Sequence, residues 1–552
     1  MALKSDIVLP TATSYTLGGV KSSTTGTTAN RDYKVEVNTD GTMKVNVPWV
    51  DTNTTYSNAT TSAAGLLSTS DKSKLDGIAA NANNYTLPTA TTTALGGVKV
   101  DDALSTTSTN PVQNKVINSN ITSINNSINS INSTIAEMSY VYGVRHYYSN
   151  SSPSLTRIGA SNLHVTLPVQ SLMKRCILAD DGTVVYYLDP SDSTKKADGT
   201  NAVLNGTDGQ VMVEVPTHYR RCTLADTYYD VEISLVPFTG AKKINKFYVS
   251  AYEAALDRNN NKLASVMNTS AQYRGGNNTS SWDDTYRSLL GMPVTAISTV
   301  TLHTYGTNRG TGWDMYEADI HDTVAWLFYI EYATLNSQLA YNENLTTEGY
   351  HQGGLGNGVI GKDWSTWSTY NGNNPIIPCG TTNSLGNKSG IVSYSPLASD
   401  GSSVWGTFSV PSYRGIENPY AHIWKWAVGY MGVGNGTNQV AYRCRNRSQY
   451  STSSLNNYYN KVGLISSSGG WTKTIVKNEY GDIIPTSVGA GDTTYFSDYL
   501  WEAHANGSIY ACLFGGRLDS GSYCGFGYLY LNLGFGYATS YLGSRLCYSA
   551  YN

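Results

Sequence analysis

Aromatic and polar side chains alternate with glycine or leucine near the C-terminal end of this sequence. The alternating set is Phe526, Tyr528, Tyr530 and Asn532, with Gly527, Leu529, Leu531 and Leu533 following each in turn. In a β-strand, a period of two places the leucines on one face and the aromatic set on the other. The leucines predict a buried face, so the opposite face should be at least partly exposed. An exposed aromatic face is unusual enough to indicate a binding surface.

Tyrosine suits such a surface because its ring packs on the C–H faces of sugars or on protein side chains, while its hydroxyl forms hydrogen bonds. Arg517 and Asp519 are the nearest charges before Arg545, and we expect them to fix the orientation of a ligand. The predicted ligand site comprises Arg517, Asp519, Tyr523, Phe526, Tyr528, Tyr530, Asn532, Tyr537 and Tyr541. The alternative is that both faces are buried, either in a sandwich or in a trimer interface.

Two other groups of residues could do chemistry, and each has a simpler structural interpretation. Arg414 and Glu417 have the charges of a catalytic pair, but a structural ion pair that locks a turn fits better. Trp424 and Trp426, which follow, are predicted to be core residues. The segment Asp257–Asn261 alternates oxygen-bearing side chains as a calcium loop does, but lacks the glycine and the terminal glutamate of a complete loop. We therefore expect an exposed turn there.

The cysteine, histidine and glycine patterns do not indicate a catalytic, metal or cofactor site. None of the eight histidines accompanies a serine or cysteine in a recognisable nucleophile motif. Gly353–Gly356 does not follow a strand-then-helix pattern, which disfavours a phosphate loop. The cysteines are scattered without a C-x-x-C pair, so we expect reduced and mostly buried thiols. They are Cys176, Cys222, Cys379, Cys444, Cys512, Cys524 and Cys547.

A regular isoleucine repeat precedes the aromatic-rich part of the chain. The spacings alternate strictly between four and three residues: Ile117, Ile121, Ile124, Ile128, Ile131, Ile135, Met138. Isoleucine at both core positions of a heptad favours three or four strands over two. The outer positions are nearly all Asn and Ser, which are poor helix formers, so burial of the isoleucines between chains must supply stability. We predict a homotrimeric coiled coil held by the six isoleucines; the alternative is one amphipathic helix packed on its own domain.

Short segments that contain Gly and Pro lie before this repeat. The sequence of Leu9–Lys21 recurs in similar form at Leu87–Lys99, which indicates successive small modules rather than one globule. Alternation from Tyr33 to Val47 around Asp40-Gly41 predicts a hairpin, because Asp-Gly tolerates the positive φ angles of a tight turn. Gly65–Ile78 predicts a short helix with Ser68 or Ser70 as its N-cap.

The chain after residue 139 has the patterns of an α+β globular head. Cys176–Leu188 predicts a hairpin around Asp181-Gly182, and Gly209–Val215 and Lys246–Ser250 predict strands. Thr323–Ala340 predicts the best helix of this part. The Gly- and Asn-rich stretch Gly349–Gly390 predicts a long irregular segment of the kind that usually serves binding.

Length and composition indicate a protein of several structural regions with a surface suited to binding a ligand. The chain has 552 residues, which is more than one ordinary domain. Only 14% of residues are charged and the net charge is -3, so no overall field favours nucleic acid or an anionic membrane. Tyrosine is abundant, with 43 residues, and provides contact area at low entropy cost. No secretory signal or stretch of membrane-spanning length is apparent, so we expect no membrane insertion.

The first quarter of the chain resembles phage tail-fibre proteins. The text that carries the resemblance is Gly65–Ala80, Leu87–Lys99 and the linker Val100–Val116 ahead of the Asn/Ser/Ile coil. The resemblance implies a stalk that joins other phage tail or baseplate proteins through its N-terminus. It also implies a virion protein that is assembled in the bacterial cytoplasm and acts outside the host cell.

Most of the remainder resembles the C-type-lectin-fold proteins of gut phages, whose closest functional relatives are the variable proteins of diversity-generating retroelements. The resemblance rests on Lys246–Leu256, Tyr273–Asn278, Gly349–Gly358, Pro411–Trp426, Phe514–Arg517 and Leu542–Leu546. It implies a C-type lectin-like domain whose C-terminal segment displays ligand-contacting side chains. Tyr523 and Cys524 depart from the small residues often found after the Gly-Gly turn, which leaves the boundaries of a variable segment open.

These predictions give an extended, β-rich stalk, a trimeric coil and an α+β, C-type-lectin-like head. The expected regions are 1–60 for tail attachment with a β-hairpin, 61–110 for small stalk modules, 111–138 for the coil, 139–240 for the β-rich start of the head, and 241–552 for the ligand-binding head. The expected function is a non-enzymatic adhesin that binds a bacterial surface glycan or surface protein. The alternatives are a polysaccharide depolymerase and an oxidase like the formylglycine-generating enzymes, for which Cys512 and Cys524 would be the nearest cysteine pair.

Overall fold

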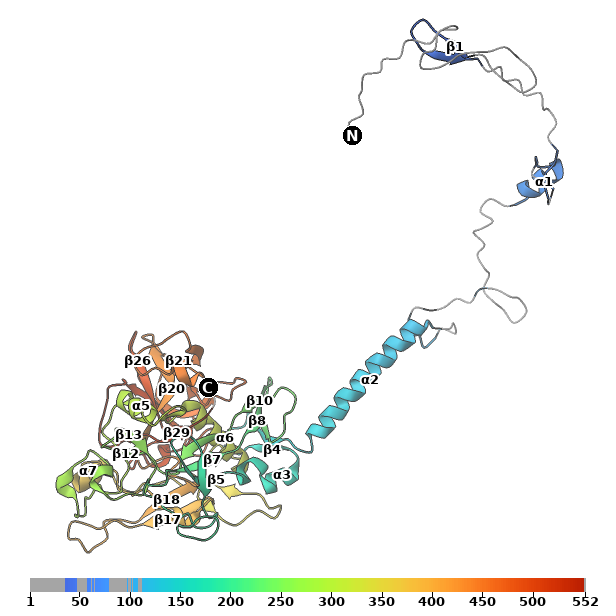
Figure 1. Ribbon diagram of the computed structural model, residues 1–552. Coiled ribbons are helices and arrows are strands. Elements are labelled where there is room, and N and C mark those ends of the chain that lie inside the picture. Colours follow the sequence, from blue (N-terminus) through green and yellow to red (C-terminus); the bar gives the residue numbers. More distant parts are fainter. Residues whose placement is uncertain are drawn as a thin grey trace. The chain divides into compact units, whose positions relative to one another are not determined.

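The computed structural model describes residues 35–46, 57–60, 62–63, 65–78, 97, 101, 103–107 and 112–550. The chain divides into two compact units, Met1–Ser123 and Ile124–Asn552, and each is described by itself. The repeated phrase Leu9–Lys21 lies outside the described residues, as does nearly all of its copy Leu87–Lys99. The division falls within the predicted coil 111–138, and the expected head, residues 139–552, belongs to the second unit; Figure 1 shows the elements along the chain.

The first unit contains both of the local structures that its sequence predicts. Strands β1 (Val35–Val37) and β2 (Met43–Val45) form an antiparallel hairpin. Its turn is held by Asp40, whose Oδ1 accepts hydrogen bonds from the backbone N of Thr42 at 2.9 Å and from its Oγ1 at 2.7 Å. Helix α1 (Thr69–Asp76) follows, with Ser68 as its N-cap accepting from the backbone N of Asp71 at 3.0 Å. The hairpin and the capped helix are both confirmed.

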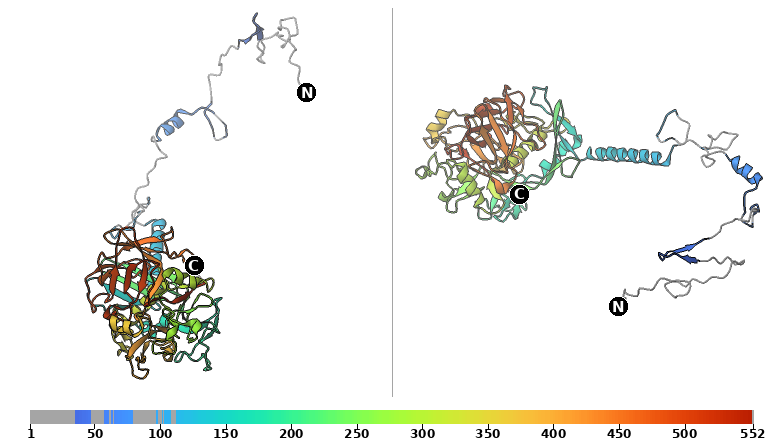
Figure 2. Two further views of the ribbon diagram at one scale, coloured as in Figure 1. Left: turned by 90° about the vertical axis from the view of Figure 1, so that its left-hand side faces the viewer. Right: turned by 90° about the horizontal axis from the view of Figure 1, so that it is seen from above.

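Helix α2 (Asn114–Glu137) carries the isoleucine repeat, and Figure 2 shows it as one uninterrupted helix. None of its residues is buried. The six repeat isoleucines are between 41% and 59% exposed, and Met138 is exposed as well. In the last turn, Glu137 Oε1 accepts a hydrogen bond from the backbone N of Thr239 at 2.8 Å, and Arg221 lies 3.4 Å from the other carboxylate oxygen. The helix is therefore fastened to the head at its C-terminal end, while no described residue of the chain buries its isoleucines.

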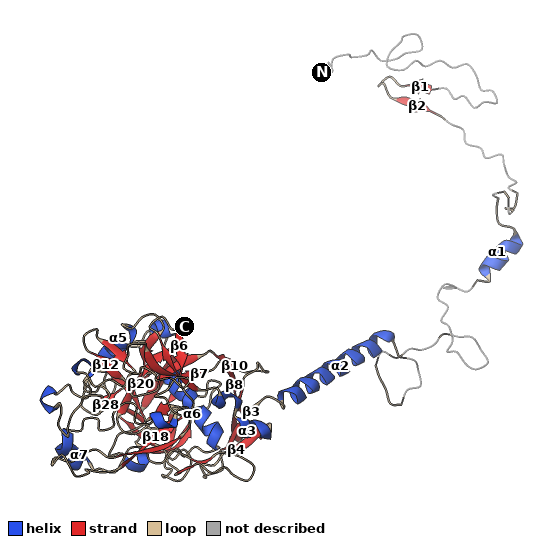
Figure 3. Cartoon of the chain, turned by 60° about the horizontal axis from the view of Figure 1, so that its bottom comes forward, coloured by secondary structure: helices blue, strands red, loops and turns tan. Residues whose placement is uncertain are grey.

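The head is built mainly from strands, with helices among them (Figure 3). An antiparallel five-stranded sheet has the order β10 (Lys242–Ile244), β8 (His218–Leu224), β9 (Tyr228–Ser234), β3 (Tyr142–Tyr147), β4 (Thr156–Gly159). A six-stranded antiparallel sheet has the order β14 (Trp313–Met315), β29 (Leu546–Tyr548), β11 (Phe247–Ser250), β7 (Gln210–Val215), β5 (Lys174–Leu178), β6 (Val184–Tyr187). The predicted hairpin over 176–188 and the two predicted strands are thus confirmed as β5–β6, β7 and β11.

The largest sheet has nine strands and carries the predicted ligand site. Its order is β22 (Asn460–Leu464), β21 (Gln439–Arg443), β20 (Trp424–Gly434), β26 (Ile509–Phe514), β27 (Leu529–Leu533), β25 (Tyr499–Glu502), β23 (Gly470–Ile475), β24 (Pro485–Val488), with β28 (Leu542–Gly543) on β20. Most pairs are antiparallel, but β25–β27 and β20–β28 are parallel. Leu513 and Trp426 pack in one core cluster, whereas Leu529 and Leu531 pack in another. The sheet therefore separates two apolar layers.

Smaller strand pairs complete the head. They are β17 (Gly390–Tyr394), β18 (Phe408–Tyr413) and β19 (Ile416–Glu417) in one sheet, β12 (Ala255–Asp257) with β13 (Lys262–Ala264), and β15 (Tyr341–Asn342) with β16 (Gln352–Gly353). The expected turn at 257–261 is confirmed as the β12–β13 connection, although Asp257 itself is buried and accepts from Asn260.

Helix α6 (Ala318–Tyr332) is the central helix of the head and packs against β20 and β3. All its residues except Asp319 are buried. The sequence predicted this helix over 323–340, but it begins earlier and ends where Ala333 adopts a left-handed conformation with φ 50°. The other helices are α3 (Ser161–Thr166), α4 (Pro168–Ser171), α5 (Thr299–Thr307), α7 (Trp364–Asn371) and the 3₁₀ turns η1 (Ala271–Tyr273), η2 (Ser280–Trp282), η3 (Asn383–Leu385), η4 (Arg447–Gln449) and η5 (Gly521–Tyr523).

Mixed α and β structure in the head is confirmed. The stretch Gly349–Gly390 is largely irregular, as predicted, and contains β16, α7 and η3. Among the helices that the structure describes, none combines the length and apolar composition that a membrane crossing requires.

Candidate functional site

A cleft of about 290 Å³ opens on one face of the nine-stranded sheet. It brings together seven of the nine residues predicted for ligand binding: Arg517, Asp519, Tyr523, Tyr528, Tyr530, Tyr537 and Tyr541. The remaining lining residues are Trp424, Trp501, Leu513, Ser520, Leu533 and Leu542. We refer to this set of thirteen residues as the aromatic cleft.

The register of three neighbouring strands places the floor of the aromatic cleft. Tyr530 on β27 lies opposite Leu513 on antiparallel β26 and opposite Trp501 on parallel β25. Residues directly opposite each other in a sheet project from the same face, so these three side chains share one surface. Trp424 joins them from β20, with its ring 5.3 Å from Tyr530 and 4.5 Å from Tyr528 between centroids.

A glycine turn after β26 shapes the wall of the cleft. Gly515 and Gly516 have φ angles of 93° and 90°, a conformation that glycine adopts without strain. A Cβ at Gly516 would lie 2.5 Å from Cys524 Sγ and 3.0 Å from the Tyr528 ring. The turn can therefore bring Arg517 over the sheet only because position 516 has no side chain.

The rings of the cleft hold one another in place. Tyr499 packs 4.4 Å from Tyr523 and 6.2 Å from Trp501, and Trp471 lies 5.1 Å from Tyr523. Trp501 and Tyr530 are nearly parallel, with an interplanar angle of 7°. Trp501, Tyr523 and Tyr537 nevertheless remain exposed. Exposed rings that are already fixed by packing lose little freedom when a ligand binds.

One ion pair provides the charges of the cleft. Arg517 Nε lies 2.7 Å from Asp519 Oδ1, and its Nη2 lies 3.3 Å from Oδ2. The guanidinium carbon lies 4.3 Å from the centroid of Tyr541 and 4.4 Å from that of Trp364, so two aromatic rings cover it. Trp364 begins α7, and the irregular stretch 349–390 thereby reaches the predicted site.

Burial raises the pKa of Tyr528 well above its ordinary value, and burial is also the first cause of the raised pKa of Tyr530. The pKa of Tyr537 is raised mainly by its neighbour Tyr541. These hydroxyls therefore stay protonated at neutral pH and act as uncharged donors and acceptors.

A buried carboxyl group supports the loop that carries Tyr523 and Tyr528. Asp498 Oδ2 accepts from the backbone N of Gly527 at 2.7 Å, and its Oδ1 accepts from Gln338 Nε2 at 2.9 Å. Gln338 Nε2 also donates to the carbonyl oxygen of Ser522 at 2.8 Å. A Cβ at Gly525 would lie 1.9 Å from Asp498 Oδ1, so this loop needs glycine where the carboxyl group packs.

Residues 33–129 match a family model described as "Head fiber protein". This confirms the resemblance to phage fibre proteins for that segment. The predicted relatives were tail fibres, whereas the matching model describes a head fibre. The match covers well under half of the chain. No match was found among curated proteins.

Two kinds of solved structure resemble the chain at low identity. The structure of PvdO from Pseudomonas aeruginosa has a TM-score of 0.26 at 9% identity, covering 63% of this chain and 98% of that protein. The M1 and P3c variants of the Major Tropism Determinant have TM-scores of 0.20 and 0.21 at 11% and 10% identity, each covering 73% of this chain and 82% of that one. Scores this low do not establish a shared fold, so a C-type-lectin-like head stays a prediction.

The structure corrects the predicted exposure of Phe526. This residue is fully buried, with its ring 5.0 Å from Phe328 and 5.3 Å from Tyr420. It precedes β27, so the two-residue alternation that governs a strand does not apply to it. Its backbone is fixed instead by the buried helix α6, because His321 Nε2 lies 2.6 Å from the Phe526 carbonyl oxygen.

The alternation describes β27 itself only in part. Leu529 and Leu531 are buried, as predicted, while Leu533 lines the aromatic cleft. Asn532 is half-buried and lies outside the lining. Tyr528 is only 5% exposed and forms part of the cleft wall.

Sequence reasoning missed the tryptophans of the site. Trp424 was expected to be core only; it is indeed buried, but it also lines the cleft. Trp501 is 45% exposed and lies on β25, before Arg517, the first residue of the predicted site. The sequence offered one signal, a tyrosine and a tryptophan alternating with other residues in Tyr499–Glu502. Only the parallel pairing of β25 with β27 shows that Trp501 belongs to the site.

The predicted Arg414–Glu417 ion pair is wrong. Arg414 Nη2 lies 2.7 Å from Glu331 Oε1 on α6, and Glu417 instead accepts from the backbone N of Thr382 at 2.6 Å. Arg414 has φ 49° in the turn between β18 and β19, and its Nε also donates to Glu331 at 3.0 Å.

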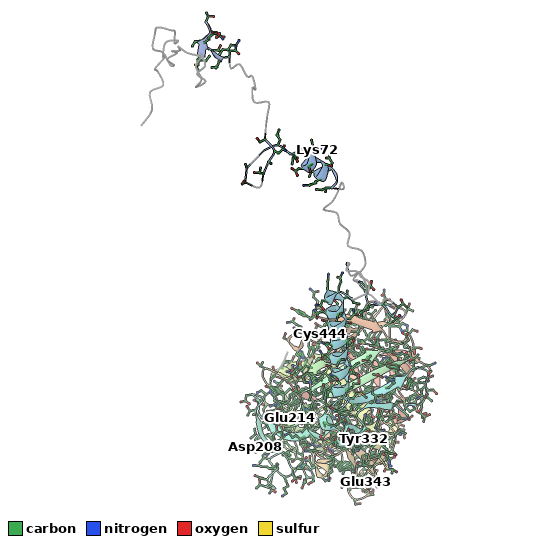
Figure 4. The ribbon with its side chains drawn as sticks, turned by 90° about the vertical axis from the view of Figure 1, so that its right-hand side faces the viewer. Lys72, Asp208, Glu214, Tyr332, Glu343 and Cys444 are labelled. Atoms are coloured by element: carbon green, nitrogen blue, oxygen red, sulfur yellow. The ribbon has the colours of Figure 1, made fainter. Side chains whose placement is uncertain are left out.

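All seven cysteines are free and buried; Cys444 is labelled in Figure 4. Burial raises the pKa of Cys524 to about 12 and that of Cys512 well above its ordinary value, so neither is a thiolate at neutral pH. The described residues contain no group of three or more His, Cys, Asp or Glu side chains arranged to hold a metal ion.

Proposed function

We propose that this protein is a homotrimeric phage adhesin that attaches the virion to a bacterial surface glycan or surface protein through the aromatic cleft. One observation carries the proposal: side chains from separate strands and loops converge on a cleft whose rings are fixed by packing yet remain exposed. Rigid aromatic side chains are favoured at recognition surfaces because they provide contact area at low entropic cost. The ligand residues proposed here are the seven predicted ones in the lining, together with Trp424 and Trp501.

The isoleucine face of α2 supports trimer assembly. Six isoleucines form one narrow exposed stripe on the helix, and among the residues that the structure describes none packs over it. Isoleucine at both heptad core positions favours more than two strands. Three copies would bury this stripe and present three clefts, so that weak single contacts add to firm attachment.

We propose virion attachment for the N-terminal part. Support comes from the match of residues 33–129 to a head fibre family, because a fibre protein of this kind is part of the phage particle. The chain would then join other tail or baseplate proteins, or capsid proteins, through its N-terminal region and act outside the host cell.

We propose binding without catalysis. Asp519 is the one carboxylate among the lining residues of the aromatic cleft and is engaged by Arg517, whereas glycoside hydrolysis commonly uses two carboxyl groups. Cys512 and Cys524 are buried, protonated thiols, which disfavours an oxidase that needs a reactive cysteine pair. Incubation with purified host capsule provides the check: intact polymer retained on the protein is expected, and shortened chains would favour the depolymerase.

The central experiment is attachment of the full-length protein to host cells. Trp501→Ala combined with Tyr537→Ala removes two exposed rings and should reduce cell binding by about tenfold or more, as loss of aromatic anchors does. The same preparations should stay trimeric by light scattering, because neither side chain lies on α2. Tyr458→Ala is the matched control, since Tyr458 is half exposed but does not line the cleft. Unchanged attachment of the double variant would refute the aromatic cleft as the receptor site.

A further inference from the structure

A second cleft, of about 270 Å³, lies elsewhere on the head and shares no lining residue with the aromatic cleft. It is bounded by β8, β10 and β11, by the start of α6, and by segments around η4 and residues 479–480. Its lining contains five basic side chains and three carboxylates, whereas the aromatic cleft contains one of each. We call it the basic cleft.

Two of the five basic side chains are neutralised within the structure. Arg447 donates from Nη2 to Glu317 Oε1 at 2.6 Å and from Nε to Oε2 at 2.9 Å. Arg445 lies 2.5 Å from Asp319 and 2.6 Å from Asp482, which sits behind the lining. These pairs build the wall of the basic cleft and leave little charge for a ligand.

The other three basic side chains, Arg220, Lys242 and Lys243, face a single remaining carboxylate. Arg220 is only 8% exposed and donates to two uncharged acceptors, the Tyr480 carbonyl oxygen at 2.7 Å and Thr323 Oγ1 at 3.4 Å. A buried cation is costly unless it has a negative partner.

The remaining carboxylate compensates this charge weakly. Lys242 Nζ lies 3.3 Å from Glu479, but both side chains are well exposed, at 38% and 63%. Exposed pairs of this kind contribute little. Lys242 lies opposite Arg220 in the β10–β8 register, so both project from the same face of the sheet. The basic cleft thus holds an excess of positive charge at one place.

The rest of the lining is apolar or aromatic. Phe247 and Ile320 are buried beneath the charges, and Ile244 is half-buried beside them. Tyr480 is flanked by Lys242 and Arg445, which lie 4.4 Å and 4.0 Å from its ring centroid. A ligand that fits would therefore carry an anionic group on a compact body with C–H surface. The volume, near the lower end of the ~300–1,000 Å³ range of small-molecule sites, suits a unit of monosaccharide size.

We propose that the basic cleft binds an acidic sugar unit of a surface polymer, with its carboxylate or phosphate held by Arg220 and Lys242 on one face of the sheet and with Lys243 adding positive charge beside them. The sugar body would lie over Phe247 and against Tyr480. The adhesin would then have a second, charge-selective contact that works independently of the aromatic cleft.

Calorimetric titration of the full-length protein tests this proposal with three probes: a galacturonic acid oligosaccharide, a glycerol phosphate oligomer and a neutral galactose oligosaccharide. The first or second should bind with an affinity that falls as salt rises, because exposed lysines take part. Comparison of the two separates carboxylate from phosphate as the preferred anion. Absence of binding by both acidic probes, or equal binding of the neutral probe at this site, would overturn the proposal.

Variants locate the binding. Lys242→Gln with Lys243→Gln should weaken binding of the acidic probe by about tenfold, and Arg220→Met should weaken it further. A melting curve shows whether Arg220→Met is folded; the lysine pair keeps the test valid if it is not. Lys461→Gln is the matched control because Lys461 is an exposed lysine outside the basic cleft. An equal loss with Lys461→Gln would show diffuse charge attraction, and a loss with Trp501→Ala would place the probe in the aromatic cleft; either result contradicts a separate site.

Discussion

Helix α2 and the aromatic cleft both expose apolar side chains, but for different reasons. On α2, the isoleucines form a stripe whose neighbours are Asn and Ser, and no residue of the helix is buried. In the cleft, the exposed rings of Trp501 and Tyr523 rest on other rings of the same chain, Trp501 on Tyr530 and Tyr523 on Tyr499. The first surface has no packing partner in the part of the chain that the structure describes, whereas the second is built from side chains of the head itself.

The difference supports the proposals that assembly covers the isoleucine stripe and that the aromatic cleft stays open to a ligand. Aliphatic side chains on a weak helix gain stability only when other copies bury them. Aromatic side chains with hydroxyl groups that the folded head already holds in place can stay exposed and bind a ligand with little further loss of entropy. Each prediction below separates the two surfaces by disturbing one of them.

The largest effect is expected from changing Ile124 and Ile128 to Asn. Two polar residues in the stripe should abolish trimer formation and leave monomers, which light scattering would detect. The head should keep its melting temperature, because its core lies within one chain. Asn126→Ala is the control: it improves helix propensity at an outer position and should leave the trimer intact. A stable trimer in the double variant would remove the proposed role of the isoleucines.

A shortened chain that begins after residue 139 should fold but attach poorly to host cells. Loss of multivalency costs between about 10²- and 10⁴-fold in apparent affinity. Surface plasmon resonance on immobilised cells or receptor, at low and high ligand density, would measure this loss. Equal apparent affinity for the shortened and full-length proteins would show that the coil does not provide avidity.

Glu331→Gln should destabilise the head without changing the trimer. Glu331 is fully buried and pairs with the partly buried Arg414, so its neutralisation leaves this guanidinium without its carboxylate partner. Removing one partner of such a pair costs about 3–5 kcal/mol in the free energy of unfolding. Urea denaturation followed by tryptophan fluorescence measures the change. Arg145→Met, at a more exposed ion pair with Asp230, should cost less; the reverse order would contradict the assignment of Glu331 to the core.

The smallest effect concerns Asp498, which supports the loop of the aromatic cleft. Burial raises the pKa of this carboxyl group well above its ordinary value. A folded-state pKa above the unfolded one favours the protonated form, so its stabilisation is greatest at acidic pH and is lost as pH rises through the folded pKa. Asp498→Asn should therefore flatten the fall in stability toward alkaline pH. Urea midpoints across the pH range provide the measurement, and an unchanged pH profile would show that Asp498 is ionised in the fold.

Local patterns in the sequence predicted local structure well. Asp40-Gly41, Ser68 and Asp181-Gly182 each mark a turn or cap that needs no distant partner, and all three were confirmed. The isoleucine repeat predicted a helical coil over 111–138, and the structure has a helix over Asn114–Glu137. Helix α6 was harder, because burial on all sides removes the amphipathic pattern by which helix boundaries are recognised.

By itself, the sequence determined that a polar chain segment would expose an isoleucine stripe, and that tyrosines would gather near Arg517 and Asp519. Those properties depend on spacing of three, four or two residues, which the backbone converts directly into a face. Only the tertiary structure decided that Arg414 pairs with Glu331, that Phe526 is buried, and that Trp501 belongs to the cleft. The physical reason is that strand pairing and buried charge partners join residues far apart in the chain, and no local period records which distant residue will lie opposite.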